Sequence, residues 1–184
     1  SNPFERFRIG AGAGSYDKDP AKMKLLPGNQ FPIEGYDNFT KQNVPRWTTT
    51  DAAIIAAYTA LVDKVCPCAI LVHSQAGQFG LRVAQARPEK VKALVLVEPA
   101  GTGDAAAIEK LAGIPILSVY GDFIEQDARW PTIRANGIKF LDAGKDKGVT
   151  HEVVDLPKAG IKGNGHMLMM DGAPDGGGRN LAPR

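Results

Sequence analysis

One serine of this chain lies where nucleophilic chemistry is commonly found. A short apolar run, Ala69 to Val72, has the length and branching of a buried strand, and Gln75 to Ala86 has helical spacing. Ser74 therefore falls on a strand-to-helix turn, where the N-terminus of the helix stabilises negative charge. Val72 and Ala76 flank it where such turns often carry two glycines. We interpret Ser74 as a candidate nucleophile, with a helix-capping serine as the alternative.

A serine nucleophile needs a base, and His166 is the candidate. It lies between glycines and follows the last expected strand, which predicts a mobile, exposed imidazole; an ordinary surface histidine is the alternative. His151 opens a strand and is expected to be structural. His73 directly precedes Ser74, so its side chain points to the opposite side and is expected to support the turn.

The acid that orients the base has several candidates. Glu98 ends the apolar run 91–97, and a carboxylate emerging from such a run requires a functional role or a buried hydrogen bond. Asp122 and Glu125 are the alternatives, in a turn after the next strand where Ile124 occupies the position expected for a carboxylate. We favour Glu98, and the order serine, acid, histidine is that of a hydrolase triad.

The elements that must position these residues alternate between strands and helices. Apolar runs at 69–72, 91–97, 115–120 and 150–155 predict buried strands, and helical periodicity covers 52–65, 75–86 and 132–143. This alternation predicts an α/β fold with a mostly parallel sheet and helices on both faces. Function collects at the carboxyl ends of such strands, where Ser74, Glu98 and Asp122 lie.

The chain divides by composition into three segments. Residues 1–47 are rich in Gly, Pro and Asn with scattered aromatics, which predicts an irregular cap-like segment; a partly disordered leader is the alternative. Residues 48–171 form the expected core portion. The segment 172–184 is low in apolar residues and is expected to be disordered.

Composition excludes several classes of function. The chain has 184 residues and a formal net charge of +2, which is too small to favour nucleic-acid binding. No run reaches the length of a bilayer span, and no signal peptide is visible, so we expect a soluble protein of undetermined localisation. Ser1 and Asn2 resemble a remnant of tag removal.

The two cysteines, Cys66 and Cys68, do not predict a metal site. Their spacing is too tight for the usual Cys-x-x-Cys motif, and no second pair completes a zinc site. We interpret them as small core residues, with a local or intermolecular disulfide as the alternative. No metal or organic cofactor is expected.

The motifs together resemble a known family. The segments are His73–Gly77, Val97–Pro99, Val119–Asp122 and Gly163–Met170, preceded by Phe7–Gly10, Gln30–Pro32 and Val44–Trp47. They are similar in order and spacing, over about residues 4–171, to the esterase-713-like group of bacterial α/β-hydrolases. The resemblance implies a serine esterase with Ser74 as nucleophile, His166 as base and, unusually, a glutamate after the sixth strand as acid, which falls on Glu98.

The chain also departs from this family. Members carry a further N-terminal half, with an oxyanion-hole loop of the His-Gly type, and a helix after the histidine. Here the backbone N–H of Gln75 is the oxyanion donor that the sequence itself offers. We therefore expect a split or processed hydrolase that requires a companion N-terminal fragment, or a homo-oligomer, to cover its sheet edges.

The predicted function is hydrolysis of a small carboxylic ester through an acyl-enzyme on Ser74. One alternative is a non-catalytic fragment or assembly module that lacks a full oxyanion hole, and another is amide or lactone cleavage or acyl transfer. Phe79 and Met167 are candidates for lining the substrate pocket, although their spacing is also that of core residues.

Overall fold

The computed structural model describes residues 2–12, 14–44 and 47–172, in two compact units. Of the described residues, the first unit comprises 2–12, 14–44, 121–128 and 155–172, and the second comprises 47–120 and 129–154. The sequence prediction for 172–184 lies, from residue 173 onward, outside the described residues. The division into a cap-like segment and a core portion stays a prediction.

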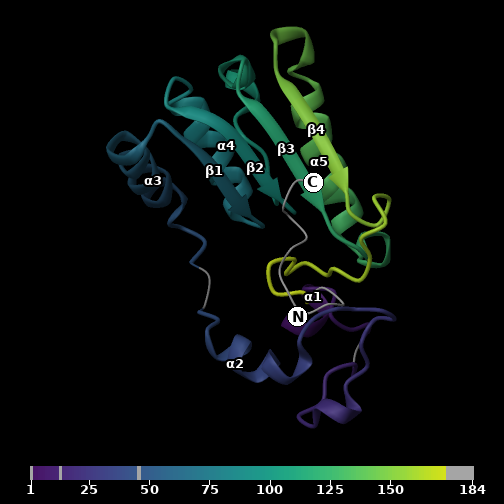
Figure 1. The fold of residues 1–184 in the computed structure, drawn as a ribbon. Helices are drawn as coiled ribbons and strands as arrows, with labels where there is room; N and C mark the ends of the chain where they lie inside the picture. Colours follow the sequence, from purple (N-terminus) through teal and green to yellow (C-terminus); the bar gives the residue numbers. More distant parts are fainter. Residues whose placement is uncertain (1, 13, 45–46, 173–184) are drawn as a thin grey trace. The chain divides into compact units, whose positions relative to one another are not determined.

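The second unit holds a four-stranded sheet with the order β1-β2-β3-β4. Its strands are β1 (Cys68–His73), β2 (Val91–Val97), β3 (Pro115–Tyr120) and β4 (Thr150–Asp155). The pairs β1–β2 and β2–β3 are parallel, and Figure 1 shows the β4 arrow pointing the same way as its neighbours. The predicted α/β class with a parallel sheet is therefore confirmed.

The helix α3 (Asp51–Val65) precedes β1, and further helices and short 3-10 turns connect these strands. They are α4 (Ala76–Ala86), η3 (Ala105–Leu111), α5 (Trp130–Asp142) and η5 (Lys145–Lys147). The helix α4 packs against β1 and β2, and in Figure 1 it lies behind these strands. Each of β1, β2 and β3 therefore leads into a helical connection that returns the chain for the next parallel strand.

The core of the second unit lies where α4 and α5 meet the sheet. Alternate residues of β1, Ile70 and Val72, pack there with Leu94, Leu96 and residues of both helices. The next residue of β1 on the other face, Leu71, is 61% exposed. In α3 two neighbouring apolar residues differ in burial: Val62 is buried, whereas Leu61 is 51% exposed.

The first unit is built around aromatic side chains. Its elements are α1 (Pro3–Arg6), η1 (Pro20–Lys22), η2 (Ile33–Gly35), α2 (Tyr36–Lys41) and η4 (Ile124–Gln126). Phe4, Ile9, Phe31 and Tyr36 form a buried cluster in which the rings of Phe4 and Tyr36 meet edge to face, with centroids 5.2 Å apart. Burial of these apolar side chains stabilises a segment that has little regular secondary structure.

The cysteines differ from the sequence interpretation. Cys66 and Cys68 do pack against the core of the second unit, but they are joined by a disulfide. Their Cα atoms are 4.5 Å apart, within the range that a disulfide bridges. The interpretation as separate small core residues is wrong, and the alternative of a local disulfide describes the structure.

Candidate active site

Ser74 occupies the turn between β1 and α4, as the sequence predicts. Its φ of +55° lies in the left-handed region that residues with a side chain rarely adopt. Three backbone hydrogen bonds hold the turn: the Ser74 N–H donates to the Val97 carbonyl (3.0 Å), and the Ser74 carbonyl accepts from Gly77 (2.9 Å) and Ala100 (2.8 Å). A strained, well-supported serine at this point is typical of a catalytic nucleophile.

Glu98 leaves the sheet beside Ser74. His73 pairs with Val97 in the parallel register, so the residues that follow them, Ser74 and Glu98, leave neighbouring strands at the same edge. Glu98 is 0% exposed and has a φ of +42°, and its N–H donates to the Val119 carbonyl (2.8 Å). Burying a carboxylate and straining the backbone both cost free energy, so a carboxylate in this position indicates a functional role.

The serine turn and the glutamate turn are packed directly against each other. Gly77 is the second residue of α4, and a Cβ added there would lie 2.6 Å from the Pro99 Cβ and 2.9 Å from its Cα. Such distances leave no room for a side chain. The glycine therefore permits the close approach of the two segments that carry Ser74 and Glu98.

Tyr120, at the end of β3, adds a buried hydroxyl near Glu98. The pKa of Tyr120 is raised to about 12, mainly by burial and also by the charge of Glu98, while Arg134 and a hydrogen bond with Ser118 act in the opposite direction. The Arg134 guanidinium lies over the Tyr120 ring, 5.1 Å from its centroid. Tyr120 consequently remains a neutral hydrogen-bonding group at physiological pH.

His166 belongs to the first unit and is not the exposed residue that the sequence predicts. It is 3% exposed. Its N–H donates to the Phe7 carbonyl (2.8 Å), and its ring stacks on that of Phe7 with centroids 5.6 Å apart. The expectation fails because a contact with a residue near the N-terminus of the chain orders the loop.

The alternative acids also lie in the first unit. Asp122 is half-buried, and its carboxylate oxygens accept from the N–H groups of Phe123 (2.8 Å) and Gly163 (3.1 Å). Glu125 is exposed in η4. Asp122 is thus engaged with backbone groups on both oxygens, whereas Glu125 faces solvent.

The remaining candidates for the site are the proposed oxyanion donor, Gln75, and the proposed pocket residues, Phe79 and Met167. Gln75 stands at the start of α4, where backbone N–H groups have no acceptor within the helix. Phe79 is buried in α4, and Met167 packs against the aromatic cluster of the first unit. Their role in binding a substrate stays a prediction.

Another serine–histidine pair serves as a comparison. The His151 Nε2 lies 3.0 Å from the Ser118 Oγ. Ser118 is 1% exposed, and burial lowers the pKa of His151. The buried position of Ser118 keeps a substrate from reaching it, so the pair is structural, as predicted for His151.

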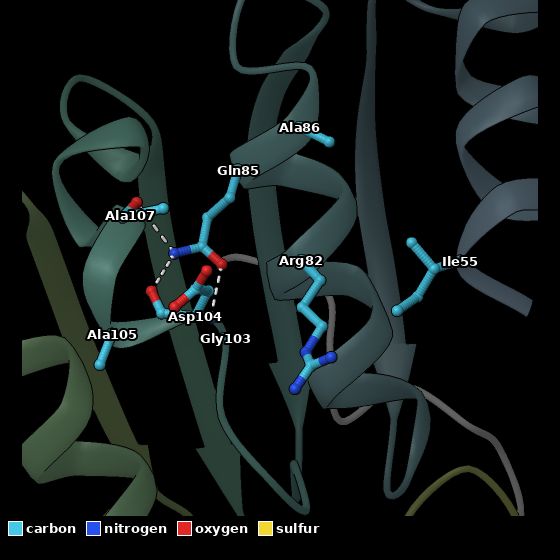
Figure 2. Close-up of a pocket in the computed structure, with 8 residues that line it drawn as sticks. All are labelled: Ile55, Arg82, Gln85, Ala86, Gly103, Asp104, Ala105 and Ala107. Atoms are coloured by element: carbon cyan, nitrogen blue, oxygen red, sulfur yellow. Dashed lines mark hydrogen bonds between the residues drawn. The ribbon is translucent and has the colours of Figure 1, made fainter. Parts of the chain in front are cut away.

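A cavity of about 600 Å³ lies elsewhere in the second unit (Figure 2). Arg82, Gln85 and Ala86 line it from the last turns of α4, opposite Ile55 of α3 and the Gly103–Ala107 segment. Ser74 precedes the first turn of α4, so this cavity is separated from it by most of the helix. It is therefore not the pocket of the serine site.

Within the ranges 2–12, 14–44 and 47–172, no group of three or more His, Cys, Asp or Glu side chains is arranged to hold a metal ion. None of the described helices has the length and hydropathy that crossing a bilayer requires.

Sequence reasoning missed two features of the structure, one in each unit. The stacking of Phe7 on His166 has no sequence signal, although Phe7–Gly10 was among the segments that resemble the family. Gln85 was read only as a helix residue, but it is 7% exposed and binds Asp104 and Ala107 backbone groups at 2.7 to 3.0 Å. A glutamine on the buried side of an amphipathic helix was the available signal.

Comparisons with known proteins identify similar chains. No protein-family model matches. A solved structure of a novel bacterial esterase is 29% identical, with a TM-score of 0.77, over 91% of this chain and 51% of that protein. The probable secreted lipase phiG of Fungal sp. (strain ATCC 74256) is 30% identical over 62% of this chain and 44% of the lipase. The chain thus spans about half the length of the proteins it matches.

Proposed function

Because this chain is related to the α/β-hydrolase-type esterases, we propose that it carries the nucleophile, base and acid of a serine hydrolase that cleaves carboxylic esters. Ser74 is the nucleophile, His166 the general base and Glu98 the acid that orients it. The proposal goes beyond the similarity itself, since the chain covers only part of the esterase and the lipase.

One observation carries the proposal: two strained, non-glycine turns lie side by side at the same edge of the sheet. Ser74 and Glu98 have φ values of +55° and +42°, and β1 and β2 end in register there. Backbone strain of this kind costs of order 1–3 kcal/mol at each residue and concentrates at active sites. A helix-capping serine would need neither the strained φ nor a buried carboxylate on the neighbouring strand.

In the acylation step the Ser74 Oγ attacks the ester carbonyl carbon while His166 takes the hydroxyl proton. The carbonyl π-bond opens, and the resulting oxyanion accepts a hydrogen bond from the Gln75 N–H at the start of α4. When the tetrahedral intermediate collapses, the C–O bond to the alcohol breaks and His166 returns the proton to the departing oxygen. Glu98 accepts a hydrogen bond from the imidazolium that forms in between.

Deacylation repeats these roles with water. His166 takes a proton from water as the water oxygen attacks the acyl carbon, and it returns that proton to Ser74 Oγ when the acid departs. The product is a free carboxylic acid, and no metal or organic cofactor takes part. Both steps require the His166 imidazole to come within hydrogen-bond reach of the Ser74 hydroxyl.

The rest of a hydrolase fold would complete this site. The matched regions cover 51% of the esterase and 44% of the lipase, so about half of each of those proteins lies outside the part that resembles this chain. We propose that the remaining part, whether continuous with this chain, a companion chain or a second copy, adds an oxyanion donor. A missing donor costs about 10²–10³-fold in rate.

The test is covalent labelling by a fluorophosphonate probe, followed by intact mass spectrometry of the purified protein. We expect one adduct on the wild type and none on Ser74→Ala. Glu98→Gln keeps the buried shape but cannot stabilise the imidazolium, so its labelling rate should fall by about 10³-fold or more. A native-mass spectrum taken alongside reports any companion chain or second copy.

The matched control is Ser118→Ala, because Ser118 also lies beside a histidine but is buried. This variant should label at the wild-type rate. Absence of labelling in a wild-type sample that unfolds cooperatively would contradict the proposal and support a non-catalytic module. Competing alcohols in a turnover assay separate hydrolysis from acyl transfer.

A further inference from the structure

The loop that carries His166 is fixed by a carboxylate from another segment of the first unit. The Asp122 N–H donates to the Asn164 carbonyl (2.6 Å), and the Gly163 N–H donates to Asp122 Oδ2 (3.1 Å). Oδ1 of the same carboxylate accepts from the Phe123 N–H (2.8 Å). Asp122 therefore ties together its own turn and the two residues that precede Gly165 and His166.

The N-terminal segment of the first unit holds the same loop from another side. The Phe7 carbonyl accepts from the His166 N–H (2.8 Å), and the Arg8 Nε donates to the Asp122 carbonyl (3.0 Å). The Arg8 carbonyl in turn accepts from the Asn29 side chain (2.9 Å). A Cβ added at Gly165 would lie 2.8 Å from the Phe7 carbonyl oxygen, so the loop and this segment are in close contact.

The ring of Phe7 lies against the imidazole itself. The two ring centroids are 5.6 Å apart and the planes differ by 27°. The ring of Phe39 also meets that of Phe7, edge to face, with centroids 5.6 Å apart. A stacked ring restricts rotation of the imidazole and faces the positive charge that a general base acquires.

The backbone on both sides of this arrangement is strained. Arg8 and Phe123 have φ values of +56° and +62°. Neither is a glycine, and such conformations persist only where surrounding contacts impose them. Both residues donate hydrogen bonds to Asp122: the Arg8 Nε to its backbone carbonyl and the Phe123 N–H to its Oδ1. These bonds are among the contacts that hold the two strained conformations.

We propose that Phe7 and Asp122 are positioning residues for His166: Phe7 fixes the imidazole plane by stacking, and Asp122 fixes the loop backbone. Asp122 is then a structural carboxylate and not the acid of the triad. The inference rests on the proposed function for its effect on rate, but the stacking geometry can be tested without it.

The kinetic test compares Phe7→Leu with Phe39→Leu, using 4-nitrophenyl acetate as the substrate. Both variants remove a half-buried ring from the same cluster, but only Phe7 stacks on His166. We expect Phe7→Leu to lower kcat about 10–100-fold with KM changed less than about threefold, because misplacement of a catalytic group acts on the chemical step. Phe39→Leu should retain kcat, and Phe7→Tyr should restore it. Equal losses in both leucine variants, or no loss in Phe7→Leu, would overturn the proposal.

A spectroscopic test separates failure of the positioning inference from failure of the proposed function. The sequence has three histidines, so their ring C–H signals in a ¹³C-histidine spectrum are assigned with His166→Gln and His151→Gln. Ring-current displacement of the His166 signal should disappear in Phe7→Leu and persist in Phe39→Leu. Asp122→Asn can accept only one of the two backbone N–H groups and should broaden or shift the same signal. An unchanged His166 signal in Phe7→Leu and Asp122→Asn would refute the positioning role, even in a protein without turnover.

Discussion

The close packing of Gly77 on Pro99 gives the sharpest test of the serine turn. In Gly77→Ala the new Cβ would lie 2.6 Å from the Pro99 Cβ, roughly 1 Å short of an ordinary carbon–carbon contact. Pro99 cannot rotate away because its ring fixes φ and it follows the strained, buried Glu98. The overlap must therefore be relieved by moving the Ser74 turn away from the Glu98 turn.

The change in the free energy of unfolding of Gly77→Ala follows from two opposing effects. Alanine gains up to about 1 kcal/mol over glycine in a helix interior, and overpacking costs about 1–3 kcal/mol. Because the overlap includes the backbone of Pro99, we expect the upper part of that cost and a net loss of about 1–2 kcal/mol. The labelling rate of Ser74 should also fall by about 10–100-fold, since its turn is displaced.

The matched control is Gly137→Ala in α5. A Cβ there would meet only the Tyr120 hydroxyl, at 3.6 Å, which is ordinary contact. The same substitution in another helix should therefore raise the free energy of unfolding by about 0.5–1 kcal/mol. Urea unfolding followed by circular dichroism should separate the two variants by roughly 1 M in midpoint. If Gly77→Ala were as stable as Gly137→Ala and labelled at the wild-type rate, the packing argument would be refuted.

Two further predictions concern buried polar groups of the second unit. The pKa of Tyr120 is about 12 in the folded chain and about 10 when unfolded, so its stabilising contribution is present below pH 10 and lost as pH rises toward 12. The urea midpoint of the wild type should fall between pH 9 and 11, and that of Tyr120→Phe should fall less steeply. If the midpoints of the two proteins fell equally with pH, the raised pKa of Tyr120 would be contradicted. Gln85→Leu removes the partners of two carbonyls and one N–H at Asp104 and Ala107 and should cost about 1–3 kcal/mol. Its Ser74 labelling rate should stay unchanged, and an unaltered free energy of unfolding would show that these bonds contribute little.

Local sequence patterns predicted the elements that carry Ser74 and Glu98. The strands at 91–97, 115–120 and 150–155 have the predicted bounds, because each is a short apolar or branched run bounded by turn residues. The α4 helix begins one residue later than predicted, directly after the serine turn. Parallel pairing then brings Ser74 and Glu98 to the same edge, which follows from topology alone.

Contacts between distant segments were not predictable in the same way. The burial of His166 depends on Phe7, which is 159 positions earlier in the sequence and carries no spacing signal. The Cys66–Cys68 disulfide depends on the local path of the chain, which brings the two Cα atoms to 4.5 Å. Exposure of Leu61 in α3 likewise depends on which elements lie beside the helix. Periodicity identifies which residues share a face, but it does not say what covers that face.

The distribution of backbone strain connects the proposed site with the inferred positioning residues. In the described part of the chain, the non-glycine residues with positive φ are Arg8, Ser74, Glu98 and Phe123. Two are the proposed nucleophile and acid. The other two donate hydrogen bonds to Asp122, Arg8 to its backbone carbonyl and Phe123 to its carboxylate. At a cost of order 1–3 kcal/mol each, this strain is comparable to the whole stability of a small domain. Because backbone strain of this kind concentrates at functional sites, its occurrence at Ser74 and Glu98 agrees with the roles proposed for them, and its occurrence at Arg8 and Phe123 agrees with the positioning role proposed for Asp122.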